Sequence, residues 1–94
     1  MEIPKNIKIG GQDVEVVFTQ WTHDNMGASD ILLSKLYINS DCSGGQQEST
    51  LLHEVIEYIN SNCALGLNHG QIATLEMMLY QVLKDNKLIF GEVE

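Results

Sequence analysis

The period of the hydrophobic pattern changes near residue 40, and this change limits the possible folds more than any other feature. Before it, the apolar residues that alternate with polar ones are Ile3, Ile7, Ile9, Val14, Val16 and Phe18. Gly10-Gly11 lies between two such runs, an arrangement typical of a β-hairpin, here near residues 5–18. Strand character returns at residues 31–39, after an aperiodic polar stretch at residues 19–30 that predicts a loop. Leu33-Ser34-Lys35 fits either a tight turn or the interior of that strand.

A first amphipathic helix is expected after this change. Ser43 followed by Gln46 can form a capping box, in which each residue satisfies a free amide of the first turn. The helix is expected at about residues 46–62. Its interior stripe is predicted to consist of Leu52, Ile56 and Ile59, beside Leu51 and Val55.

A second helix is expected at about residues 69–85, where Asn68 and Gln71 repeat the capping pattern. Its apolar stripe is predicted to consist of Ile72, Leu75, Leu79, Val82 and Leu83. Strands first and helices after predict an α+β fold in one domain over residues 1–94. We expect a small antiparallel sheet of three or more strands from residues before about 40, followed by two helices packed on each other and on the sheet.

Charge and composition exclude several functions. The net charge is −8 and all five basic residues are lysines, whereas nucleic-acid binding needs clustered positive charge and favours arginine. The same acidity disfavours anionic membrane surfaces. Neither a secretion signal nor an apolar run long enough to span a membrane is evident in the sequence. We therefore expect a cytoplasmic protein that contacts neither nucleic acid nor membrane, with Cys42 and Cys63 reduced.

The first candidate metal ligands are His53 and Glu57, which are four residues apart on the first predicted helix. Two ligands one turn apart on one helix face can hold the same metal ion, as in the zinc motif H-E-x-x-H. Glu57 stands where that motif has its second histidine, but His69 follows twelve residues later at a helix start. His53, Glu57 and His69 would supply the two histidines and one glutamate of an open catalytic zinc site. Glu54 has the general-base position of the motif.

The segments STLLHEVIEYIN (residues 49–60) and LYQVLKDN (residues 79–86) resemble small phage and prophage proteins of the minimal zincin-like metallopeptidase type. They are more distantly similar to the ImmA/IrrE peptidases. The resemblance extends over roughly residues 27–87, and it implies a zincin-like minimal fold, one zinc ion and a phage protein made in a bacterial cytoplasm. Many of these relatives carry the complete H-E-x-x-H, from which this chain departs at Glu57.

Other chemically capable side chains are interpreted as structural. His23 lies in a polar stretch and is expected at the surface. Tyr58 fits core packing, with donation to a substrate oxyanion as the alternative. The residues expected to pack in the core are Cys63, Met77, Met78 and Tyr80.

Two functions of different classes fit the sequence. One is a zinc-dependent hydrolase, most plausibly a peptidase, in which an edge strand within residues 31–38 aligns a peptide or protein substrate by β-augmentation. The other is a non-catalytic phage accessory protein that retains the fold as an interaction module. In that case exposed apolar surface on the second helix would serve a homodimer or another partner.

Overall fold

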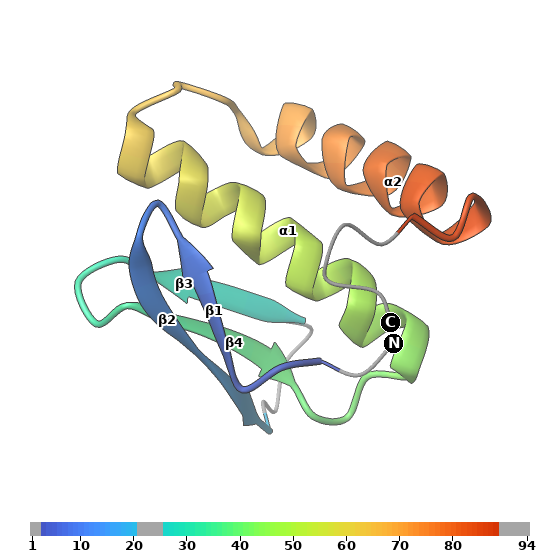
Figure 1. The fold of residues 1–94 in the computed structure, drawn as a ribbon, viewed down its shortest axis with the longest axis horizontal. Coiled ribbons are helices and arrows are strands. Elements are labelled where there is room, and N and C mark those ends of the chain that lie inside the picture. Colours follow the sequence, from blue (N-terminus) through green and yellow to red (C-terminus); the bar gives the residue numbers. More distant parts are fainter. Residues whose placement is uncertain (1–2, 21–25, 89–94) are drawn as a thin grey trace.

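The computed structural model describes residues 3–20 and 26–88. Its elements are, in order, β1 (Asn6–Ile9), β2 (Gln12–Thr19), β3 (Gly27–Asp30), β4 (Lys35–Asn39), α1 (Gly44–Cys63) and α2 (His69–Asp85). The sheet forms one layer, α1 runs across it, and α2 lies on the side of α1 that faces away from the sheet (Figure 1). The predicted α+β fold, with strands before two helices, is confirmed.

The sheet has the strand order β1-β2-β4-β3 and is mixed. β1 and β2 form the predicted hairpin around Gly10 and Gly11, whose positive φ angles of 58° and 81° suit glycine. β3 and β4 form a second antiparallel pair. The two pairs join through β2 and β4, which run parallel with Val16 opposite Leu36. The predicted antiparallel pairing therefore holds for β1–β2 and β3–β4 and is wrong for β2–β4, which pair in parallel.

The region around β3 also departs from prediction. Residues 27–30 were predicted to be part of a loop, but the sequence Gly-Ala-Ser-Asp forms a strand. It has no apolar alternation of its own and is held by backbone pairing to β4. Residues 31–34 form a turn in which Ser34 has φ of 54°, so the ambiguous Leu33-Ser34 segment is a turn and β4 begins at Lys35. β4 pairs on both sides, so the edge strand expected within residues 31–38 is not there; β3 lies at the end of the sheet.

The core lies between the sheet and α1. Its buried hydrophobic residues are Ile9, Val14, Val16, Leu36, Ile38, Leu51 and Tyr58. The prediction that Leu52, Ile56 and Ile59 form the interior stripe of the first helix was wrong: Leu52 and Ile56 are half-buried and Ile59 is 36% exposed. The reason is that α1 lies between two layers. Thr50, Leu51, Glu54 and Tyr58 are the buried residues of α1, whereas Leu52 shares a groove with residues of α2.

α2 is held less firmly than α1. Ile72 is its one buried residue, and the predicted stripe is otherwise half-buried or exposed. Met77, Met78 and Cys63, which were expected in the core, are exposed. Tyr80 is half-buried, and its hydroxyl donates to Glu48 Oε1 at 2.7 Å. The predictions for α2 failed because α2 packs on α1 and is separated from the sheet by it, so that one helix face cannot cover the whole apolar surface of α2 (Figure 1). Cys63 is exposed at the last residue of α1.

Candidate metal centre

His53 and Glu57 are brought together by the helix alone. They lie one turn apart on α1, and His53 Nε2 is 3.5 Å from Glu57 Oε2. Both side chains are largely covered, with 17% and 28% of their surface exposed. The i, i+4 spacing therefore produces the half-site that the sequence predicted.

His69 reaches this half-site because the connection between the helices turns back over α1. α1 ends in a left-handed residue, Ala64, with φ of 53°. Asn60 then holds the connection through both its side-chain atoms: Nδ2 donates to the Leu67 carbonyl at 3.2 Å, and Oδ1 accepts from the Leu67 amide at 2.9 Å. Asn68 caps α2 through the predicted capping box, so His69 is the first residue of that helix.

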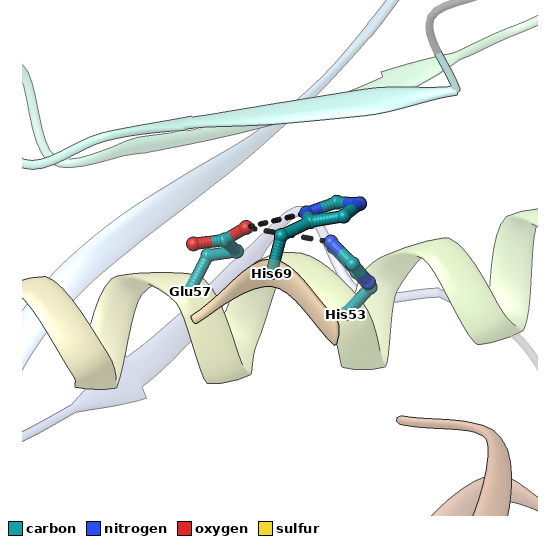
Figure 2. A group of neighbouring side chains, drawn as sticks. All are labelled: His53, Glu57 and His69. Atoms are coloured by element: carbon teal, nitrogen blue, oxygen red, sulfur yellow. Dashed lines mark ion pairs between the residues drawn. The ribbon is translucent and has the colours of Figure 1, made fainter. Parts of the chain in front are cut away.

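The three side chains meet at one point. Glu57 Oε2 lies 3.5 Å from His53 Nε2 and 3.9 Å from His69 Nδ1 (Figure 2). One ring nitrogen of each histidine and one carboxylate oxygen all lie within 4.8 Å of one another. Ligand atoms at about 2.0–2.1 Å from a tetrahedral zinc ion are about 3.3–3.4 Å apart, so the His53–Glu57 distance is already close to that value. His53, Glu57 and His69 thus form a group that could hold a metal ion.

His69 is the ligand with most freedom to adjust. Its side chain is 82% exposed, and its ring lies 5.5 Å from the His53 ring between centroids, inclined at 62°. The two rings are therefore not stacked face to face. An exposed histidine can change rotamer at little cost, so the centre can close around an ion through movement of one side chain.

Glu76 also contacts this group, and the sequence reasoning missed it. Glu76 Oε1 lies 3.5 Å from Nδ1 of His53, the ring nitrogen that does not face Glu57. The signal was present in the sequence: Glu76 follows His69 by seven residues, close to two helical turns, so the two share a face of α2. α2 therefore contributes two of the four side chains that meet here.

Glu54 follows His53 on α1, lies one helical turn before Glu57 and contacts β3. It is buried, and a Cβ added to Gly27 would lie 3.0 Å from Glu54 Cγ and 2.8 Å from the Tyr37 carbonyl oxygen. Glycine at residue 27 therefore allows β3 to approach the helix. Burial, and to a smaller extent the charge of Glu57, raises the pKa of the Glu54 carboxyl to about 7. A group with this pKa is present in both protonation states near neutral pH.

The remaining candidates lie apart from the centre. Tyr58 is fully buried and its hydroxyl donates to Gln12 Oε1 at 2.9 Å, which agrees with the packing interpretation. Neither Cys42 nor Cys63 belongs to the group of ligands found within residues 3–20 and 26–88. His23 lies outside the residues that the structure describes.

Comparison with protein families, with curated proteins and with solved structures gave no significant match to this chain. Over the described part of the chain, neither α1 nor α2 combines the length and the apolar character that crossing a membrane requires. The geometry of the site itself is thus the observation from which a function can be argued.

Proposed function

We propose that the chain is a zinc-dependent hydrolase of the minimal zincin-like type, acting on peptide bonds in a bacterial cytoplasm and encoded by a phage or prophage. The observation that carries this proposal is the convergence of His53, Glu57 and His69 within 4.8 Å. Two histidines and one glutamate are the ligand set of open catalytic zinc sites, which leave one position for water or substrate. The exposure of His69 fits a centre that solvent can reach.

The residues of the chain fit the chemistry of the proposed reaction. A bound zinc ion would polarise the scissile carbonyl and activate a water molecule for attack. Glu54 is the proposed general base, and its pKa of about 7 suits a carboxylate that accepts a proton and then transfers it to the leaving amine. Within the described residues β3 is an edge strand, and its Gly27 lies against Glu54, so an extended peptide could pair with the edge of β3 that no described strand occupies.

Metal binding is the first test of the proposal. Protein purified without a histidine tag should bind one equivalent of zinc, measured by elemental analysis and by competition with a chromophoric chelator. His53→Ala, Glu57→Ala and His69→Ala should each weaken binding by more than about 100-fold, because each removes one of three ligands. Glu15→Gln, which changes an exposed carboxylate on β2, is the matched control. Wild-type protein that binds no zinc above the control level of a denatured sample would refute the metal centre.

Activity is the second test, because zinc binding does not require catalysis. Wild-type zinc protein should cleave an unbiased pool of fluorogenic peptides, and Glu54→Gln should retain zinc but lose cleavage by a factor of about 100 or more. A zinc protein on which Glu54→Gln has no effect in any assay would favour a non-catalytic role.

One observation favours that second candidate, a non-catalytic interaction protein. The exposed apolar residues of α2 include Leu75, Met78, Leu79 and Val82. Their spacing places them on one helix stripe, and such a stripe suits a homodimer or another protein partner. Sedimentation at micromolar concentration separates the candidates. If the stripe forms a homodimer, wild-type protein should sediment as a dimer and the Leu79→Lys variant as a monomer. If the chain is a monomeric enzyme, both should sediment as monomers.

A further inference from the structure

His53 contacts a carboxylate at each of its two ring nitrogens. Glu57 Oε2 lies 3.5 Å from Nε2, and Glu76 Oε1 lies 3.5 Å from Nδ1. The two nitrogens lie on opposite sides of the imidazole ring, so only one of them can point at an ion shared with Glu57. When Nε2 binds an ion shared with Glu57, the ring hydrogen lies on Nδ1, which is the nitrogen that faces Glu76.

We propose that Glu76 is a positioning residue of the metal centre: its carboxylate accepts the Nδ1 hydrogen of His53 and thereby directs Nε2 toward the ion. This inference rests on the metal site proposed above. Metal-ligating histidines commonly donate their second ring hydrogen to a carboxylate, which fixes the tautomer and the ring orientation and makes the ligating nitrogen more basic. Glu76 acts through His53 and is not itself a ligand.

The location of Glu76 supports this assignment over a direct ligand role. The group of three side chains whose ligand atoms converge is His53, Glu57 and His69, and Glu76 is not in it. It meets His53 from the side that faces away from Glu57. A carboxylate on that side cannot bind the same ion without the His53 ring turning over.

His53 and Glu76 are more deeply buried than His69. The side chains of His53 and Glu76 are 17% and 22% exposed, whereas that of His69 is 82% exposed. An interaction between partly buried groups is stronger and less screened than one at the surface. α2 thus brings an adjustable ligand at its first residue and a covered support two turns later. His53 is held in place before an ion arrives, and His69 closes on it.

The experiment compares zinc affinity in wild-type protein, Glu76→Gln and Glu76→Ala. Glu76→Ala should weaken zinc binding by about 10–100-fold, the range typical of carboxylates that orient a ligating histidine. Glu76→Gln should weaken it less, because the amide oxygen still accepts a hydrogen bond from Nδ1. Asp85→Asn is the matched control, since it removes one carboxylate from the far end of the same helix. It should leave affinity within about twofold of wild type.

The tautomer of His53 can be read from long-range proton–nitrogen NMR correlations. This measurement does not depend on the overall stability of the protein. Zinc-bound wild-type protein should show hydrogen on Nδ1 of His53 and zinc on Nε2, whereas zinc-bound Glu76→Ala should show a mixture of the two arrangements. Affinity in Glu76→Ala equal to that of Asp85→Asn, with an unchanged tautomer, would overturn the positioning role and leave the metal site intact. A loss as large as that of His53→Ala would instead make Glu76 a ligand and also overturn it. If wild-type protein binds no zinc, the proposed function fails and the positioning role fails with it.

Discussion

α1 and α2 begin alike and are held differently. Each starts with a complete capping box, formed by Ser43 with Gln46 in α1 and by Asn68 with Gln71 in α2. α1 then packs against both the sheet and α2, and it buries four residues, whereas α2 buries Ile72 alone. The proposed metal centre includes residues from both helices. Its half-site on α1 is fixed by helix geometry, and its other half depends on whether α2 stays docked.

This comparison predicts how the site and the fold respond to perturbation. Changes on the sheet side of α1 should unfold the whole protein, because they remove the core itself. Changes to the packing of α2 should separate the two halves of the proposed metal centre while the sheet and α1 persist. Regions of low local stability are typically those that move on ligand binding, so zinc should protect α2 more than it protects the sheet.

Tyr58→Ala should have the largest effect on the α1 side of the comparison. Tyr58 is fully buried and its hydroxyl donates a hydrogen bond to Gln12 on β2. Truncation to alanine therefore leaves a cavity and removes this hydrogen bond to the hairpin. The free energy of unfolding in urea should fall by about 3–5 kcal/mol, or the cooperative transition should disappear. Tyr58→Phe is the control and should cost about 1 kcal/mol, the value of one hydrogen bond. A Tyr58→Ala protein within 1 kcal/mol of wild type would show that the α1–sheet core is not what holds the fold.

Ile72→Ala tests the α2 side. It removes most of the one fully covered side chain of α2 and should weaken the docking of that helix by about 2–4 kcal/mol. Hydrogen exchange should then become faster across residues 69–85 and change little in β2 and β4. Zinc affinity should fall as well, because His69 and Glu76 both move with α2. Uniformly faster exchange over the entire chain would mean that the two helices unfold as one unit and that the contrast between them does not exist.

The sequence predicted best where local rules decide the structure. Both helix starts followed from capping pairs, and the first hairpin followed from Gly10-Gly11. The approach of His69 to His53 and Glu57 was also predictable, since helix spacing joins the first pair and a short connection returns the chain. These features depend on residues close together in sequence, where propensity and capping leave few alternatives.

The failures share a different cause, which is tertiary context. β3 has no apolar pattern and exists through pairing with β4. The parallel pairing of β2 with β4 depends on how two hairpins join, which no local pattern encodes. The stripe around Ile56 was assigned to the core because a single amphipathic face was assumed, whereas α1 has packing partners on two sides. Glu76 was missed because its role depends on which nitrogen of His53 is free, a property of the assembled helix pair.

The pH dependence of the free energy of unfolding tests one buried residue of α1, Glu54. The pKa of Glu54 is raised from 4.5 to about 7 in the folded protein, mainly by burial and then by the charge of Glu57. The folded state therefore holds this proton more tightly than the unfolded state does. The free energy of unfolding should fall as the pH rises from about 4.5 to about 7 and then stay level, a change of at most about 3 kcal/mol.

The measurement is urea unfolding of metal-free protein at several pH values between 5 and 8. Glu54→Gln should flatten the profile and should be more stable than wild type at pH 8, because a neutral amide avoids the burial of a charge. Glu15→Gln, an exposed carboxylate on β2, should keep the wild-type slope. An equally steep profile in Glu54→Gln would mean that another group carries the dependence and that the sheet side of α1 tolerates a charge.

The smallest expected effect comes from the two helix caps. They allow a direct comparison of α1 with α2, because both are capping boxes of the same kind. Ser43 Oγ accepts from the Gln46 amide at 3.3 Å, and Asn68 Oδ1 accepts from the Gln71 amide at 2.8 Å. Ser43→Ala and Asn68→Ala should each cost about 1 kcal/mol in helix stability. Only the second should also weaken zinc binding, by a few-fold, because Asn68 fixes the first turn of α2 at the ligand His69, whereas Ser43 lies more than two turns before His53. Chelator competition on both variants measures the difference. Equal zinc affinity in the two would show that the start of α2 is set by Asn60 and its two hydrogen bonds to Leu67, with the cap contributing to stability alone.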